Sequence, residues 1–395
     1  MGLYAPLIFL FCALAVGSVG ICFAEGGSRV ATSGGVYGYV EAVFGPLLGY
    51  VAGTLLWFGN ALSCAGITAA LADIALSLLP PSVSPPMRAA VRALVIIAAI
   101  GAFAIVNIGG AARVARFVSA ATLVKLLPIA IFVILGVGAV QLENFTQAGT
   151  PGLDGFGRAA ILVLFATMGM ETPLTASGEV ANPARTIPRA LLISISGVTI
   201  LYIAIQLIAQ GILGPALAQS STPLADAMGR IDPGLRLLLL AGAAISMFVW
   251  IGSNTLGTPR MLFAFARDGL LPRALGSVHP RSHAPAAAIL CYATIVAGFA
   301  LSGTFADLAA QAALATAAYY ILGCAAVWRM ARRGIAAMGP PLNFRWLGVA
   351  ACVGIASMIF MIALASAAEI IGLAAIIAIS AAIYLLSTRM RRPRP

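Results

Sequence analysis

The chain has 395 residues, of which 61% are hydrophobic and 9% are charged, and its formal net charge is +11 at pH 7. A composition this apolar excludes a soluble globular domain. The positive charge does not indicate a nucleic-acid partner, because the basic residues are spread over many loops and not over one soluble face.

Apolar stretches long enough to cross a bilayer recur along the whole chain, and each predicts a transmembrane helix. None shows the alternation of a barrel strand, so we expect an all-α, polytopic helical membrane protein with about 11 transmembrane helices. The second stretch is longer than a span requires and should tilt or extend beyond the bilayer. In chain order the stretches cover about residues 4–24, 46–79, 87–107, 117–139, 157–177, 189–213, 234–258, 286–303, 307–328, 347–367 and 369–387.

The basic residues gather in alternate loops between these stretches. If the C-terminal tail is cytoplasmic, most of the 23 lysines and arginines lie on the cytoplasmic side. This asymmetry is what the positive-inside rule predicts, so the charge indicates a multi-pass protein of the inner membrane with a cytoplasmic C-terminus. The basic residues expected elsewhere are Arg88, Arg92, Arg158, Arg230 and Arg236 outside, and Lys125 within a span.

Residues for enzyme or metal chemistry are scarce. The six cysteines lie inside apolar stretches at irregular spacing, which is typical of small hydrophobic residues in a helix bundle. The two histidines, His279 and His283, share one loop, and no paired acids occur at helical spacing. Without a glycine-rich phosphate loop or repeated filter residues, the sequence favours neither an ATP-driven pump nor a channel. We expect no enzyme and no cofactor.

The most informative feature is the fifth apolar stretch, where Phe165-Ala-Thr-Met-Gly-Met-Glu171 interrupts a membrane helix at Gly169. An unwound helix leaves backbone groups unpaired, and it persists only where protein or a ligand-filled cavity supplies partners. Carbonyls near Phe165, Ala166 and Thr167 would lie at the negative end of a half-helix and could accept an ammonium group. The alternative is an unbroken helix with a tolerated glycine and a core aromatic residue.

Three side chains of this stretch have predicted roles. Phe165 would act as an aromatic gate over the substrate, and Met170 would form an adaptable wall. Glu171 is an acid in mid-membrane, where acids are costly and usually functional. It would either contact the substrate or hold the two half-helices together.

Lys125 is a second ionisable residue within a span. A buried ammonium needs a partner or loses its proton. We therefore consider Lys125 a candidate functional residue. The alternative is a lysine that extends to the cytoplasmic face.

Two polar faces lie on other apolar stretches. Trp57, Asn60 and Ser63 share one face of the second stretch, and Trp250 and Asn254 lie one turn apart on the seventh. We consider these side chains candidates for lining a substrate path. The alternative is that they join helices, as polar residues in membranes often do.

Several loop motifs follow one another in a distinctive order. They are Glu25-Gly-Gly-Ser-Arg29, Ser33-Gly-Gly-Val-Tyr-Gly-Tyr39, Phe44-Gly-Pro-Leu-Leu-Gly49, Pro188-Arg189 after Glu179-Val-Ala-Asn-Pro183, and Arg260 through Ala266-Arg-Asp268-Gly-Leu-Leu-Pro272.

These motifs resemble the amino acid–polyamine–organocation permeases over nearly the whole chain. The resemblance implies a single permease domain, residues 1–395, with a LeuT-like inverted-repeat fold. Residues 1–139 would form the remainder of the first repeat, 155–330 the second repeat, 345–387 two additional helices and 388–395 a basic tail. By this alignment the first family helix is missing, the chain holds family helices 2–12, and we expect translation to start upstream of Met1.

The resemblance also implies secondary active transport of an amino acid or polyamine by alternating access. The substrate amine would bind at the helix break, the faces of Trp57 and Trp250 would line the cavity, and Lys125 would replace sodium, so that transport is proton-coupled or an exchange. The alternative is an N-terminally truncated, non-transporting fragment or a partner-dependent subunit. Expected partners are the small-molecule substrate, the lipid bilayer and, as a possibility, a second copy in a homodimer, but no nucleic acid.

Overall fold

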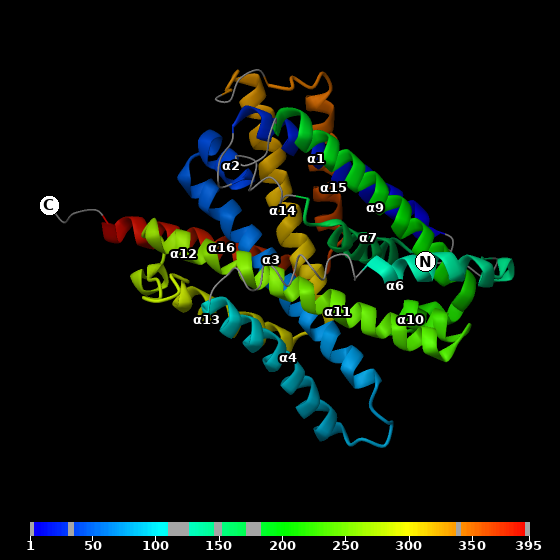
Figure 1. The fold of residues 1–395 in the computed structure, drawn as a ribbon. Helices are drawn as coiled ribbons and strands as arrows, with labels where there is room; N and C mark the ends of the chain where they lie inside the picture. Colours follow the sequence, from blue (N-terminus) through cyan, green and yellow to red (C-terminus); the bar gives the residue numbers. More distant parts are fainter. Residues whose placement is uncertain are drawn as a thin grey trace.

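A computed structural model describes residues 4–30, 35–109, 126–145, 152–170, 183–336 and 341–391. Over these residues the chain forms α-helices joined by turns and short 3-10 helices (Figure 1). The α-helices are α1 (Ala5–Arg29), α2 (Val36–Phe44), α3 (Pro46–Ser77), α4 (Pro85–Ile108), α6 (Leu126–Gly136), α7 (Leu153–Thr167), α9 (Pro183–Leu213), α10 (Pro223–Gly229), α11 (Pro233–Gly257), α12 (Pro259–Arg267), α13 (Ala286–Ser302), α14 (Phe305–Arg332), α15 (Leu347–Ala363) and α16 (Ala367–Arg391).

Each apolar stretch that the sequence predicts overlaps a helix in the described part of the chain. Seven helices there are long and apolar enough to cross a membrane, beginning with α1, α3, α4 and α9 and including α11, α14 and α16. The apolar helices α6, α13 and α15 are shorter. The prediction of a polytopic helical membrane protein is confirmed, and α3, with 32 residues, is longer than one span requires.

The centre of the molecule is the crossing of α3 and α14, both of which are largely buried (Figure 1). Small residues allow the close approach: a Cβ on Gly59 would lie 2.9 Å from the Thr316 hydroxyl, and one on Gly66 would lie 3.3 Å from the Leu308 side chain. Without a hydrophobic force between helices in lipid, such close backbone packing is a main source of helix association.

Helix α1 lies between α9 and α15 and also contacts α7. Aromatic rings mark these contacts, since Phe11 of α1 packs against Phe156 of α7 and Phe360 of α15. Phe9 of α1 meets Tyr202 of α9 edge to face, with ring centroids 6.1 Å apart. This packing brings the end of α7 into the space between α1 and α9.

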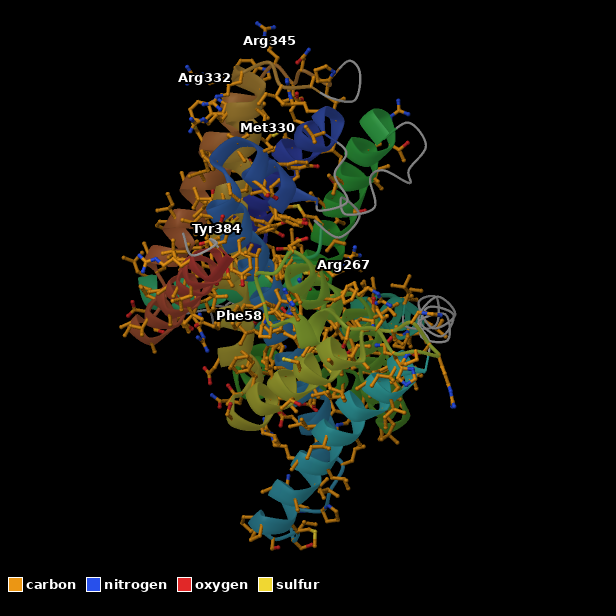
Figure 2. The ribbon with its side chains drawn as sticks, turned by 90° about the vertical axis from the view of Figure 1, so that its left-hand side faces the viewer. Phe58, Arg267, Met330, Arg332, Arg345 and Tyr384 are labelled. Atoms are coloured by element: carbon orange, nitrogen blue, oxygen red, sulfur yellow. The ribbon has the colours of Figure 1, made fainter. Side chains whose placement is uncertain are left out.

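Basic residues mark one end of the molecule. Figure 2 shows Arg332, at the end of α14, and Arg345, in the turn before α15, at the same end. Both guanidinium groups lie over tryptophan rings, Arg332 over Trp328 and Arg345 over Trp346. Arginine beside exposed tryptophan is typical of a membrane–water boundary.

Candidate functional site

Helix α7 stops in the middle of the apolar stretch that the sequence singles out. The last helical residue is Thr167, Met168 is extended, and Gly169 has a φ of +110°. Residues that have a Cβ atom rarely adopt that backbone conformation, so a glycine at this position permits the chain to leave the helix. The continuation, residues 171–182, lies outside the described part of the chain.

The carbonyls in the last turn of α7 find partners outside the helical ladder. The Leu164 carbonyl accepts a hydrogen bond from the Thr167 hydroxyl at 3.0 Å. The Phe165 carbonyl accepts one from the Met168 backbone N–H at 3.4 Å, and the Ala166 carbonyl accepts one from the Tyr202 hydroxyl of α9 at 3.1 Å. A carbonyl has two lone pairs, so each of these three can accept another donor.

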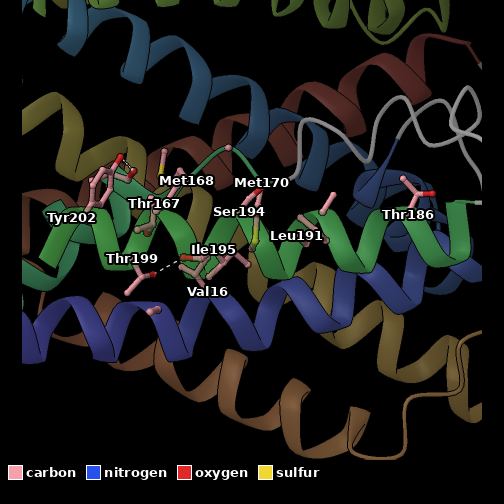
Figure 3. Close-up of a pocket in the computed structure, with 15 residues that line it drawn as sticks. Val16, Thr167, Met168, Met170, Thr186, Leu191, Ser194, Ile195, Thr199 and Tyr202 are labelled. Carbon is pink, nitrogen blue, oxygen red and sulfur yellow. Dashed lines mark hydrogen bonds between the residues drawn. The ribbon is translucent and has the colours of Figure 1, made fainter. Parts of the chain in front are cut away.

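A cavity of about 390 Å³ opens beside this helix end (Figure 3). It lies between α1, α9 and the end of α7, and the close-up shows the Met170 side chain lying across α9. Residues of α9 supply one whole side of it. The lining residues are Ala13, Val16, Ala166, Thr167, Met168, Gly169, Met170, Thr186, Ala190, Leu191, Ser194, Ile195, Val198, Thr199 and Tyr202.

The described lining of this cavity consists of apolar side chains and hydroxyl groups, with no charged side chain among them. Two of the hydroxyls are bonded within their own helices, Thr167 to the Val163 carbonyl and Thr199 to the Ile195 carbonyl. The Tyr202 hydroxyl instead reaches from α9 to α7. The cavity therefore suits a small ligand that is largely apolar and offers a hydrogen-bond donor to the end of α7.

The residues predicted around the break mostly line this cavity, as Ala166, Thr167, Gly169 and Met170 do. Phe165 packs away from it, edge to face with Phe305 of α14 at 5.7 Å between ring centroids. Glu171 lies outside the described residues, and so does Lys125, which precedes α6.

The predicted faces of α3 and α11 meet one another instead of the cavity. The Asn254 side-chain amide donates to the Asn60 side-chain carbonyl at 3.2 Å. The side-chain carbonyl of Asn254 accepts from the Thr258 hydroxyl at 3.2 Å and from the Tyr292 hydroxyl of α13. Trp57 meets the Tyr292 ring edge to face at 6.1 Å.

Next to this cluster, the Trp57 indole nitrogen and the Ser63 hydroxyl oxygen are buried and have no hydrogen-bond partner among the residues that the structure describes. Trp250 lies one turn before Asn254 on α11, half-buried against the core. Of the predicted substrate residues, Ala166, Thr167, Gly169 and Met170 thus line the cavity, whereas Trp57, Asn60 and Asn254 lie where α3, α11 and α13 meet.

Sequence reasoning missed the contribution of α9. Its contribution to the cavity lining includes the hydroxyl residues Thr186, Ser194, Thr199 and Tyr202. Their presence in the sequence carries little information alone, because hydroxyl residues in membrane helices usually bond to their own backbone.

Comparison with known proteins places the chain in a family. A family model described as amino acid permease matches residues 1–372. A methylthioribose transporter of Bacillus subtilis is 27% identical over 328 residues, 78% of this chain and 70% of the relative. An uncharacterized transporter of Mycobacterium tuberculosis is 29% identical over 378 residues, 93% of this chain and 82% of the relative. A branched-chain amino acid permease of Bacillus subtilis is 28% identical over 318 residues, 73% of this chain and 65% of the relative.

The expected resemblance is therefore confirmed, and these relatives are named as transporters and not as enzymes. Together with a bundle of helices long enough to span a membrane and a helix that breaks beside a cavity, the match over residues 1–372 means that this chain belongs to the amino acid permease family and is a membrane transporter of the amino acid type.

Proposed function

We propose that this protein is a secondary active transporter that moves a small amino acid or related amine across the inner membrane by alternating access. The observation that carries the proposal is the end of α7, whose Ala166 carbonyl lies at the cavity beside the Gly169 break. The C-terminal end of a helix has a partial negative charge, which favours an ammonium group.

The cargo class that the cavity suits best is a neutral, largely apolar amino acid. Its described lining offers alanine, valine, leucine, isoleucine and methionine side chains and hydroxyls, and none of these would compensate a second positive charge. Two of the relatives are named for cargoes without net positive charge, methylthioribose and branched-chain amino acids. Leucine is therefore the first probe.

Counterflow in proteoliposomes tests the proposal. Vesicles that hold the purified protein and an excess of unlabelled leucine should accumulate labelled leucine transiently, whereas protein-free vesicles should not. An ion current without leucine exchange would identify a channel. If the protein shows a cooperative thermal unfolding transition but neither leucine exchange nor an ion current, the alternative of a partner-dependent subunit is favoured.

A cationic cargo is the second candidate, and Glu171 is the residue that motivates it, since an acid in a membrane segment is usually functional. If the cargo is arginine, lysine or a polyamine, Glu171→Gln should abolish its uptake and spare neutral amino acids. Unchanged cationic uptake in this variant rejects the cationic assignment.

Sodium independence rests on Lys125 and on its resemblance to a sodium-replacing lysine. Exchange of sodium for choline should leave leucine uptake unchanged, and Lys125→Ala should remove most transport while the protein keeps its thermal transition. Full uptake in Lys125→Ala would remove the coupling role.

The orientation and assembly state are also proposals. The basic residues of the loops support a cytoplasmic C-terminus. A fluorescent protein fused after Pro395 should therefore fold and fluoresce, and a periplasmic alkaline phosphatase fused there should stay inactive. Light scattering of the detergent complex tests for a homodimer.

A further inference from the structure

The strongest unassigned feature of the cavity is the bond between Tyr202 and the end of α7. The Tyr202 hydroxyl donates to the Ala166 carbonyl at 3.1 Å, and the two residues are 36 positions apart in the chain. Both residues line the cavity (Figure 3). The bond therefore spans the cavity wall from α9 to α7.

The bond occupies an acceptor that the break creates. The last carbonyls of a helix have no partner in their own ladder and must be satisfied from elsewhere. In α7 the Leu164 and Phe165 carbonyls are satisfied locally, by Thr167 and by the Met168 backbone. The Ala166 carbonyl takes its donor from another helix.

The Tyr202 ring also contacts α1. Phe9 of α1 contacts it edge to face, with an interplanar angle of 64°. The phenolic hydroxyl is a single neutral donor at the tip of this ring, and its O–H can turn about the C–O bond. A ligand can therefore displace the hydrogen bond without moving the ring.

We infer that Tyr202 is a specificity-determining residue whose hydroxyl holds the place of the cargo's amine in the empty transporter. On binding, an ammonium group takes over the Ala166 carbonyl and the Tyr202 hydroxyl turns away. A cargo without an amine cannot make this exchange and leaves the tyrosine bond in place. The inference rests on the proposed function, because it assigns a role in amine recognition at the same cavity.

The test compares leucine with 4-methylpentanoate, which has the same side chain and carboxylate but no amine. Tyr202→Phe keeps the ring and removes the competing donor, so the Ala166 carbonyl is left for the cargo. The KM for leucine counterflow should fall about five-fold, the effect of roughly one net hydrogen bond. The inhibition constant of 4-methylpentanoate should stay unchanged. Tyr384→Phe, on α16 and outside the cavity lining, is the matched control and should change neither constant.

Two results overturn the inference. An unchanged or raised KM for leucine in Tyr202→Phe would show that the hydroxyl does not compete with the cargo. An equal fall in the KM for leucine and in the inhibition constant of 4-methylpentanoate would show that the hydroxyl affects binding only by its volume or its bound water, and not by competing with the amine.

A second variant and a second readout separate this inference from the proposed function. Phe9→Leu removes the ring that supports Tyr202 and should lower the leucine KM in the same direction but by less. Leucine should also raise the thermal transition of Tyr202→Phe more than that of the wild type. If the wild type shows neither leucine counterflow nor stabilisation by leucine, the proposed neutral cargo and the inference are both rejected. If the wild type exchanges leucine normally and the variants do not differ from it, the inference alone is rejected.

Discussion

The side-chain carbonyl of Asn60 on α3 accepts a hydrogen bond of 3.2 Å from the side-chain amide of Asn254 on α11. The side-chain carbonyl of Asn254 in turn accepts from the hydroxyls of Thr258 and Tyr292, so the side chain of Asn254 connects α3, α11 and α13. Polar bonds of this kind hold membrane helices together. The cluster thus acts as a joint next to the α3–α14 crossing.

Replacing Asn254 should lower the free energy of unfolding more than replacing Asn60. Asn254→Ala removes three bonds, and with about 0.6 kcal/mol for an average membrane hydrogen bond the loss should approach 2 kcal/mol. Asn60→Ala removes two bonds, the one from Asn254 and its own to the Leu56 carbonyl, and leaves the bonds of Asn254 to Thr258 and Tyr292 intact. It should therefore cost about 1.2 kcal/mol, less than Asn254→Ala. Unfolding in detergent measures both variants, and equal losses would contradict the central role of Asn254.

The helices themselves could be predicted from the sequence, whereas the helices against which each one packs could not. An apolar run of about 20 residues is sufficient evidence for a span, because backbone groups in lipid have no alternative to the helix. The end of α7 was likewise readable, since Gly169 sits within such a run. Periodicity placed Asn60 and Asn254 on helix faces but could not tell whether those faces meet a cavity or each other, because one helix carries no information on its packing partner.

A second part of the site was out of reach for a different reason. Tyr202 lies in an ordinary apolar run, and nothing local distinguishes it from a lipid-facing tyrosine. Its importance arises from the Ala166 carbonyl, which belongs to another helix. Only the three-dimensional arrangement reveals a donor that satisfies a broken helix.

A buried ion pair secures the end of α1. Arg29 bonds the Glu25 carboxylate at 2.8 Å, the Ile335 carbonyl at 3.3 Å and the Asn343 side chain at 2.8 Å, each through a different nitrogen. The Glu25 carboxylate also accepts from the backbone N–H groups of Asn343 and Phe344. Glu25 is fully buried, so the pair fixes the segment before α15 against α1.

Arg29→Lys should loosen that segment although the charge is kept. A lysine ammonium cannot reproduce the fork of a guanidinium that bonds three acceptors, and we expect a loss of about 1–3 kcal/mol. Trypsin should then cleave faster after the exposed Arg345 (Figure 2). Arg333→Lys, at an exposed position, is the control and should stay within about 0.5 kcal/mol. Unaltered cleavage in Arg29→Lys would show that the pair does not restrain the segment.

At the start of α7 a second ionic group connects three helices. Arg158 bonds Glu369 of α16 and, at 3.2 Å, Asp307 of α14. The two acids differ in exposure, since the Glu369 side chain is 11% exposed and that of Asp307 is 68% exposed. Screening by water and salt is therefore much stronger at Asp307.

Arg158→Gln should cost about 1–2 kcal/mol, because it leaves the shielded Glu369 without its cation while the half-exposed arginine limits the effect. Asp307→Asn should lower the stability by less than about 1 kcal/mol, and at high salt this variant should be as stable as the wild type. Thermal unfolding of the purified protein at low and at high salt measures both. A larger loss in Asp307→Asn than in Arg158→Gln would reverse the assignment of Glu369 as the main partner.

Gly169 offers a test in which contacts with other residues play no part. Among the described residues, a Cβ on Gly169 would meet no atom within 4 Å, and the same is true of Gly197 within α9. The two positions differ in backbone conformation, since Gly169 has a φ of +110° and Gly197 is helical. Gly169→Ala should therefore lower stability by about 1–3 kcal/mol through strain alone, whereas Gly197→Ala should raise it by about 0.5–1 kcal/mol.

The same pair of variants separates stability from transport. Relief of the strain in Gly169→Ala would turn the Ala166 and Thr167 carbonyls away from the cavity, so the leucine KM should rise several-fold even at temperatures where the variant is fully folded. Gly197→Ala should keep the wild-type KM because its backbone does not change. If both variants transport leucine as the wild type does, the positive φ at Gly169 is not required for the cargo site, and the proposed role of the α7 end would have to be abandoned.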